Sequence, residues 1–316
     1  MPFLYDPGAS MSKVSVLILR AAGINCDEET AHAFRLAGAE RVDPVHINAF
    51  IQGRRRLSEY DVLVLSGGFS YGDDLSGGKV LANEMQCKLM EDVETFIGEG
   101  KLILGICNGF QVLVKMGLLP QTERGGRRQE ATVFYNDSGK FECRWVYLRR
   151  NPDSPCVFTR DMPETIYIPV ANGEGKVILA SEDVRSRLGP GGHIALQYVN
   201  PPWVSAGESA GVAGGEATAT VARVAGGEAT VVVAREAAEV AAELATAATP
   251  YPWSPNGSVD AIAGICDSTG RIFGLMPHPE RYTHPTHHPR WTREGCREPD
   301  GLHIFRNAVN YVRGVQ

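Results

Sequence analysis

A cysteine near the middle of the chain stands where an apolar run meets a helical pattern. Residues 101–106 read as a buried strand, and Cys107 follows them between Gly105 and Gly109. This order is typical of a nucleophile elbow, a sharp strand-to-helix turn that projects its side chain clear of the sheet. The N–H groups at the start of the helix favour the thiolate, the reactive form of cysteine. Cys107 is therefore a candidate nucleophile; the alternative is an ordinary buried cysteine.

A histidine and a glutamate near the other end of the chain form the second chemical feature. The short, largely apolar run 272–276 is followed by His278 and, two residues later, by Glu280. Alternate side chains of an extended segment point to the same side, so these two can face one another. The carboxylate would then fix the imidazole tautomer, and the imidazole would take the proton of Cys107. The three residues together predict a Cys-His-Glu triad for acyl transfer.

A glycine-rich loop follows the strand predicted at 62–65. A nucleotide-binding loop would need glycine where Asp73 stands and serine or threonine where Val80 stands, so the sequence argues against ATP binding here. Glycines at this edge of a sheet let a backbone amide approach a ligand closely. An amide of the Gly67-Gly68 pair and the N–H of Asn108 are therefore candidates for an oxyanion hole.

Hydrophobic periodicity places these features in an α/β fold. Near-continuous apolar runs predict strands that are covered on both faces, as in a parallel sheet, and they alternate with amphipathic helical patterns. We therefore expect a doubly wound, mostly parallel sheet with flanking helices. The expected strands are 14–19, 42–47, 62–65, 101–106, 165–170, 258–266 and 271–276, and the expected helices are 27–37, 80–98, 108–116 and 302–312.

Two further segments allow more than one interpretation. The turn signal at 136–139 predicts a hairpin within residues 134–148 and an antiparallel portion of the sheet. Glu174 lies between Gly173 and Gly175, where it is either a solvated turn residue or a carboxylate placed against the ammonium group of a ligand.

Residues 204–249 change abruptly to alanine, glycine, valine, threonine and glutamate. Within them the twelve residues 213–224 recur, slightly changed, as 225–236. Two copies are too few for a repeat architecture, so we expect a low-complexity surface insertion. The expected organisation is an N-terminal extension at 1–12, with Met11 as an alternative start, and one domain over 13–316 that carries this insertion.

The composition of the chain bears on its partners, its location and its metal binding. The net charge of −6 has both signs interspersed, which does not favour nucleic acid or an anionic membrane as a partner. Seven cysteines without a C-x-x-C pair indicate reduced thiols, and with no signal-peptide pattern they predict a cytoplasmic location. His284, His287 and His288 lack an acid or cysteine at ligand spacing, so no metal is expected.

Several ordered motifs resemble one family. Gly105-Ile-Cys107-Asn-Gly109-Phe-Gln111 and Pro277-His278-Pro-Glu280 resemble class I (triad) glutamine amidotransferases. A closer resemblance is to the glutaminase subunit of phosphoribosylformylglycinamidine synthase. It spans nearly all of the chain outside residues 1–12 and 204–249, and it departs from the usual pattern at Asn172, where histidine is common, and at Ser66. The motifs that carry it are 23–27, 67–73, 105–111, 173–175, 256–258, 263–266 and 276–281.

This resemblance implies a mechanism and a set of site residues. Cys107 would form a glutamyl thioester with glutamine, and His278, oriented by Glu280, would act as base and then as acid. By the same resemblance, the N–H groups of Gly68 and Asn108 would form the oxyanion hole. The substrate-binding residues implied are Gly68, Phe69, Asn108, Gln111 and Glu174.

The resemblance also implies partners. Ammonia would pass to a separate synthetase subunit, which would bind ATP, magnesium and formylglycinamide ribonucleotide, and a small bridging subunit would accompany the two. No cofactor is expected on this chain. Two alternatives stay open from the triad alone: another cysteine-dependent amidase or hydrolase of the same fold, and a glutamine-sensing subunit with an inactive triad.

Overall fold

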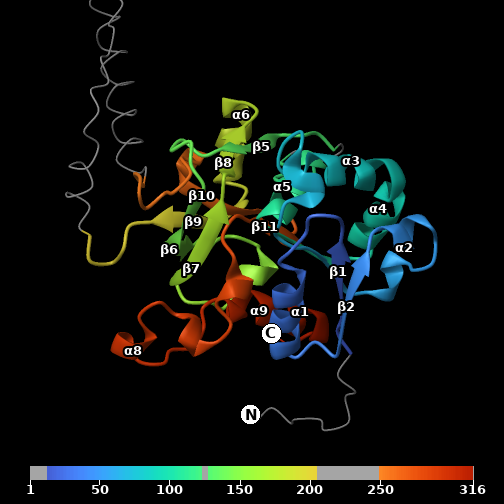
Figure 1. Cartoon of the computed structure of the whole chain (residues 1–316). Helices are drawn as coiled ribbons and strands as arrows, with labels where there is room; N and C mark the ends of the chain where they lie inside the picture. The colour runs from blue at the N-terminus through green and yellow to red at the C-terminus, as the bar shows by residue number, and fades with distance from the viewer. Residues whose placement is uncertain (1–12, 123–126, 205–248, 316) are drawn as a thin grey trace, which may run out of the picture.

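The computed structural model describes residues 13–122, 127–204 and 249–315 (Figure 1). The predicted extension at 1–12 and nearly all of the predicted insertion at 204–249 lie outside these residues. No helix among the described residues is both long and apolar enough to cross a membrane.

A nine-stranded sheet forms the centre of the molecule, in the order β2-β1-β3-β4-β11-β10-β9-β6-β7. The five strands on the β2 side are parallel to one another. Strands β3, β4 and β11 are buried along their whole length, which explains their continuous apolar sequences. These five strands are β1 (Ser15–Arg20), β2 (Arg41–His46), β3 (Val62–Leu65), β4 (Leu102–Ile106) and β11 (Ile272–Leu275).

The other part of the sheet is antiparallel, as the turn signals predicted. It contains β6 (Glu142–Arg150), β7 (Thr165–Asn172), β9 (Ile194–Val199) and β10 (Ile262–Cys266). A separate two-stranded sheet pairs β5 (Ala131–Tyr135) with β8 (Glu174–Leu179). The mixed sheet, whose parallel half is covered by helices, confirms the predicted fold class.

The hairpin predicted within 134–148 is wrong. Strands β5 and β6 flank the predicted turn, but β5 pairs with β8 while β6 pairs with β7 and β9. The Asn136 side chain explains the separation, because its Nδ2 donates to Lys140 O at 3.0 Å and to Asn172 O at 2.8 Å. The turn is thus attached to the end of β7, and its two strands diverge into different sheets.

Helices cover both faces of the parallel strands. In Figure 1, α1 (Asp27–Leu36) and α9 (Leu302–Arg313) lie together below the sheet, while α3 (Lys79–Lys88) and α5 (Asn108–Lys115) lie above it. The rings of Phe34 in α1 and Phe305 in α9 pack edge to face with their centroids 5.0 Å apart. The remaining helices are α2 (Asn48–Ile51), α4 (Met90–Gly98), α6 (Glu182–Leu188) and α8 (Trp291–Glu294), with 3-10 turns η1 (Leu57–Glu59), η2 (Ser70–Asp73), η3 (Val157–Thr159), η5 (Val259–Ala261), η6 (Pro279–Arg281) and η7 (Pro285–His287).

Two expected elements have different bounds. The single helix predicted at 80–98 is divided into α3 and α4 at Leu89, whose φ of −130° is not helical and whose side chain is buried. The strand predicted at 258–266 begins only at Ile262, because residues 259–261 form the turn η5. Strands β8 and β9 and helix α6 were not predicted, since their short patterns lie beside the low-complexity segment and a glycine-rich turn.

Candidate active site

The sharp turn predicted at Cys107 is present between β4 and α5. Cys107 has φ 51° and ψ −105°, a strained conformation for a residue with a side chain, and its N–H donates to Leu275 O at 2.8 Å. Gly109 makes this turn possible, since a Cβ there would lie 1.8 Å from Leu65 O. The absent side chain lets α5 start directly against β3, and this fixes the direction of Cys107.

His278 and Glu280 meet as predicted. Glu280 accepts a hydrogen bond from Nδ1 of His278 at 2.6 Å, and both side chains are buried. The His278 backbone N–H donates to Pro169 O at 2.8 Å, which ties the pair to β7. Nε2 of His278 has no hydrogen-bond partner among the described residues. The second ring nitrogen is therefore available to a reacting group.

The electrostatic environment favours the protonated imidazole. Burial by itself lowers the pKa of His278, but the charges of Glu280 and Cys107 outweigh this effect and raise that pKa well above its ordinary value. The protonation of His278 thus depends on both Glu280 and Cys107.

Cys107 and His278 open onto one cavity of about 340 Å³. A larger cavity of about 600 Å³ near residues 249–261 contains no member of the triad, so the chemistry and not the size identifies the site. Four of the five predicted substrate-binding residues line the cavity together with Cys107 and His278, whereas Asn108 and Glu280 are not among its lining residues. The lining residues are Asn25, Gly68, Phe69, Asp73, Cys107, Gln111, Tyr135, Phe141, Cys143, Ala171, Asn172, Gly173, Glu174, His278 and Arg281.

The backbone at Gly68 approaches a neighbouring loop very closely. Its φ is +145°, and a Cβ there would lie 2.8 Å from both Asn25 N and Gly23 O, so this position requires glycine. The N–H of Phe69 donates to Gly23 O at 2.9 Å, whereas that of Gly68 has no acceptor within the described part of the chain. The N–H of Asn108, at the first position of α5, has no acceptor within its helix either. Both predicted oxyanion-hole donors are thus free to bind a ligand.

The Asn108 side chain organises the surrounding loop, a function that the sequence did not reveal. It is buried, and its Oδ1 accepts from the Ser70 N–H at 3.1 Å. Its Nδ2 donates to Asp73 Oδ1 and to Gln111 Oε1, both at 2.9 Å. Asp73 also accepts from the Gly78 N–H at 3.1 Å, and burial raises the pKa of this carboxyl. The glycine-rich loop is in this way fastened to the helix that carries the nucleophile.

Gln111 and Glu174 are joined to one another at the opposite wall. Gln111 Nε2 donates to the backbone oxygen of Glu174 at 2.7 Å, and the Glu174 carboxylate accepts from the Gly77 N–H at 3.0 Å. The buried Lys115 donates to Gly77 O at 2.6 Å, and burial lowers the pKa of its ammonium. Glu174 is thus held by a defined contact, and is neither a freely solvated turn residue nor an unpartnered acid.

Sequence reasoning did not single out two residues beside the triad, Cys26 and Arg281. Cys26 is buried, and Arg281 Nη2 donates to its sulfur at 3.3 Å. No spacing rule connects residues 255 positions apart, so only the fold reveals this pair. Ligand atoms of Cys26, His278 and Glu280 lie within 4.8 Å of one another, as in a metal site. The guanidinium at Cys26 and the tight His278–Glu280 bond fit a proton-transfer pair better than a cation.

The three histidines at 284–288 make local contacts. His284 Nδ1 accepts from the Thr286 N–H, His287 Nδ1 from the Thr283 N–H, and His288 Nδ1 from the Arg290 N–H. Each Nδ1 is therefore used in shaping the turn after η6.

Comparison with known proteins places this arrangement in a family. The chain matches the CobB/CobQ-like glutamine amidotransferase domain over residues 13–210 and 207–312. It is 44% identical to the phosphoribosylformylglycinamidine synthase subunit PurQ of Dehalococcoides mccartyi, over 96% of this chain and all of that protein. The PurQ subunit of Methanococcus maripaludis (strain S2 / LL) is 39% identical, over 94% of this chain and 96% of its own length.

A solved structure gives the same result. A chain of the PurLQS structure from Thermotoga maritima is 27% identical and superposes with a TM-score of 0.61, covering 95% of this chain and 99% of that one. The chain therefore belongs to the PurQ family, the glutamine amidotransferase subunits of phosphoribosylformylglycinamidine synthase.

Proposed function

We propose that this chain hydrolyses glutamine at Cys107 and supplies the ammonia to a synthetase subunit that makes formylglycinamidine ribonucleotide in purine synthesis. The observation that carries the proposal is the strained Cys107 turn in one cavity with His278, whose Nδ1 is bonded to the buried Glu280. Such a pairing is suited to acyl transfer from an amide.

The reaction would proceed in two halves. His278 takes the proton of the Cys107 thiol as the sulfur attacks the side-chain carbonyl carbon of glutamine. The C–N bond then breaks, and His278 gives that proton to the departing ammonia. His278 then takes a proton from water, whose oxygen attacks the thioester carbon. The C–S bond breaks, glutamate is released, and His278 returns the proton to the sulfur of Cys107. The N–H groups of Gly68 and Asn108 would stabilise the negative oxygen in both halves.

The walls of the cavity would hold the substrate. Phe69, about half exposed, would cover its methylene groups. The Gln111–Glu174 contact would present an amide and a carboxylate to its polar atoms. Pre-formed polar groups in a cavity of this size favour a small polar substrate over a peptide.

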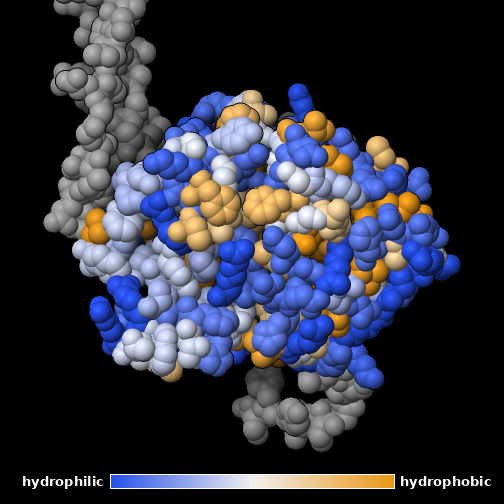
Figure 2. All heavy atoms as spheres, viewed as in Figure 1, coloured by the Kyte–Doolittle hydropathy of each residue, from blue (hydrophilic) through white to orange (hydrophobic). Residues whose placement is uncertain are grey.

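Exposed apolar side chains at the mouth of the cavity support the proposal that a partner protein binds there. Phe69, Tyr135 and Phe141 line it and are 47–61% exposed, and Leu75 in the adjacent loop is 74% exposed. On the face shown in Figure 2, hydrophobic residues gather near the centre of an otherwise polar surface. Such a group is suited to a protein interface.

We further propose what the partners contribute. The synthetase subunit would cover this mouth, bind ATP and Mg²⁺, and receive ammonia, while a small bridging subunit completes the complex. This chain would need no cofactor of its own. Its seven free cysteines support a reducing, cytoplasmic location.

The test is glutamate release from glutamine by the purified chain, with and without the synthetase subunit and its nucleotide substrates. We expect release that depends on the partner and falls by roughly 10⁴-fold or more in Cys107→Ala. Absence of release from a folded complex would contradict the proposal and favour an inactive, glutamine-sensing subunit. Hydrolysis of other amides but not of glutamine would favour a different amidase.

A further inference from the structure

Glutamine carries two charges that its hydrolysis leaves unchanged, an α-carboxylate and an α-ammonium. A cavity that orients the side-chain amide toward Cys107 gains most by pairing both of them. The lining of the cavity has acids for the ammonium in Asp73 and Glu174, and it has one arginine, Arg281. On the premise that glutamine is the substrate, we propose that Arg281 binds its α-carboxylate and that Cys26 holds the guanidinium in position.

The position of Arg281 suits this function. It ends the turn η6, one residue after Glu280, and its side chain remains 39% exposed although the neighbouring triad residues are fully buried. Nη2 donates to the Cys26 sulfur at 3.3 Å, and Nε lies 3.9 Å from Glu280 Oε1. A guanidinium has five N–H donors, so several remain for a carboxylate in the cavity.

The acids of the cavity have other partners than Arg281. Asp73 accepts from Gly78 and Asn108, and Glu174 accepts from Gly77. No ion pair joins Arg281 to either acid in the described ranges of the chain. The opposite charges are therefore kept apart inside one cavity, as recognition of a zwitterionic amino acid requires.

Cys26 gives Arg281 a fixed support. It is 3% exposed, its N–H donates to Gly67 O at 3.2 Å, and its thiol is 3.4 Å from Oδ1 of the cavity residue Asn25. Helix α1 begins immediately after it. Holding a flexible arginine in advance reduces the entropy that is lost when substrate binds.

The experiment compares two substrates in the intact complex with its synthetase subunit. Glutamine has the α-carboxylate, and 4-aminobutanamide is the same molecule without it. We expect Arg281→Met to lower kcat/KM for glutamine by about 10²–10³-fold, chiefly through KM, because a buried charge loses its partner. The same variant should change kcat/KM for 4-aminobutanamide by less than about threefold. If turnover of that amide is too slow to follow, its inhibition constant against glutamine replaces kcat/KM.

Conservative variants separate binding from folding. Arg281→Lys keeps the charge and should recover part of the lost kcat/KM. Cys26→Ala should raise KM for glutamine with a smaller effect on kcat. Cys26→Ser should bring KM most of the way back to the wild-type value. An equal loss for both substrates in Arg281→Met would overturn the inference and make Arg281 a support of the triad. Failure of the proposed function can be told apart from failure of this inference, because the wild-type complex would then release no glutamate.

Discussion

At the scale of single residues, His278 has to serve as a base and an acid in one catalytic cycle. Its raised pKa depends on Glu280, a fully buried carboxylate with no contact to bulk water. The charge of Glu280 therefore determines the pH range in which His278 is protonated while ammonia leaves.

Replacing Glu280 by glutamine keeps the shape and removes this charge. Without the carboxylate the pKa of His278 falls, so the protonated imidazole is lost at a lower pH. We expect kcat/KM for glutamine to drop by about 10²–10⁴-fold and the alkaline limb of its pH profile to move to lower pH. Thermal unfolding of the variant controls for folding. A pH profile with the wild-type midpoint would show that Glu280 does not set the protonation of His278.

At the scale of elements, sequence patterns predicted those helices and strands that depend only on residues close together in the sequence. The strand and helix around Cys107 were predictable, because a buried apolar run, a glycine and a helical period are all local. The break at Leu89 was not, since the helical period continues through it and only packing in the core reveals the bend. The partners of β5 and β6 depend on the contact of Asn136 with Asn172, which no local pattern contains.

The elbow predicts a sharp contrast between two glycines. In Gly109→Ala the new Cβ would lie 1.8 Å from Leu65 O, and the helix would have to move away from the sheet. We expect a loss of roughly 3 kcal/mol or more in the free energy of unfolding and loss of glutaminase activity. Gly98→Ala is the matched control, because no atom lies within 4 Å of its Cβ and α4 is helical there. It should be neutral or stabilise by up to about 1 kcal/mol. Equal unfolding midpoints in urea would contradict this account.

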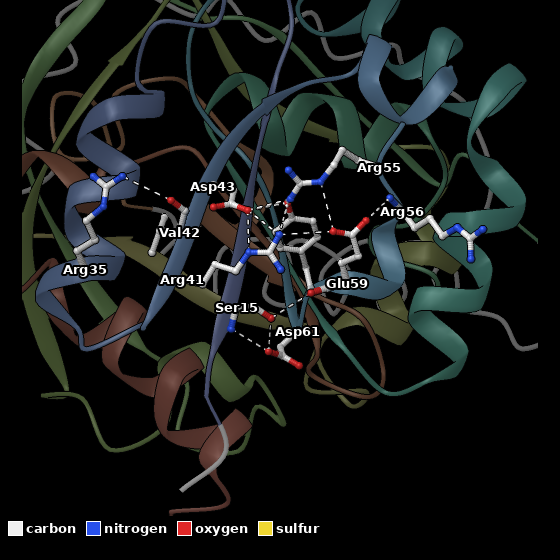
Figure 3. A network of polar contacts seen from close by, with 10 residues as sticks. Ser15, Arg35, Arg41, Val42, Asp43, Arg55, Arg56, Glu59 and Asp61 are labelled. Atoms are coloured by element: carbon white, nitrogen blue, oxygen red, sulfur yellow. Dashed lines mark hydrogen bonds and ion pairs between the residues drawn. The ribbon is translucent and has the colours of Figure 1, made fainter. Parts of the chain in front are cut away.

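A polar network supports the edge of the sheet at β2, far from the cavity. Figure 3 shows Arg41, Asp43, Arg55 and Glu59 converging there. The hydroxyl of the buried Tyr60 donates to Asp43 at 2.9 Å and accepts from Arg55. Burial, together with Asp43, raises the pKa of Tyr60 to about 12. Charged groups at an edge strand also discourage pairing with other chains.

Tyr60→Phe removes this hydroxyl and leaves the ring in place. We expect the free energy of unfolding to fall by about 1–2 kcal/mol, because Asp43 and Arg55 lose a buried partner. Glutaminase activity of the complex at 25 °C should be unchanged. Chemical denaturation measures the first quantity and glutamate release the second; a stable variant with low activity would contradict the assignment of this network to stability.

At the scale of the whole molecule, the site is assembled from segments that are far apart in the chain. Cys107 and the His278–Glu280 pair were predictable because each lies at the end of a short apolar run, where a reactive side chain is recognisable from the sequence alone. The Cys26–Arg281 contact and the Asn108 network were not, because only the order of the strands brings these segments together. The resemblance to a family supplied substrate and partner, which spacing alone left open.

Replacement of residues 205–248 by a short glycine–serine linker tests the predicted insertion. Thr249 is bonded to Tyr198 O at 2.9 Å, and residue 204 follows the end of β9 closely, so both ends lie near one strand end. We expect the shortened chain to keep its unfolding midpoint within a few degrees and its partner-dependent glutaminase activity within about threefold. Loss of activity without loss of stability would assign the segment to function.

The most direct test of the central claim is to identify the residue that carries the glutamyl group during turnover. The complex is quenched in acid while it hydrolyses glutamine, and its peptides are analysed by mass spectrometry. We predict a glutamyl adduct on the peptide that contains Cys107 and none on the peptide that contains Cys26, the other buried thiol near His278. Turnover without an adduct on Cys107, or an adduct on Cys26, would contradict the assignment of Cys107 as the nucleophile.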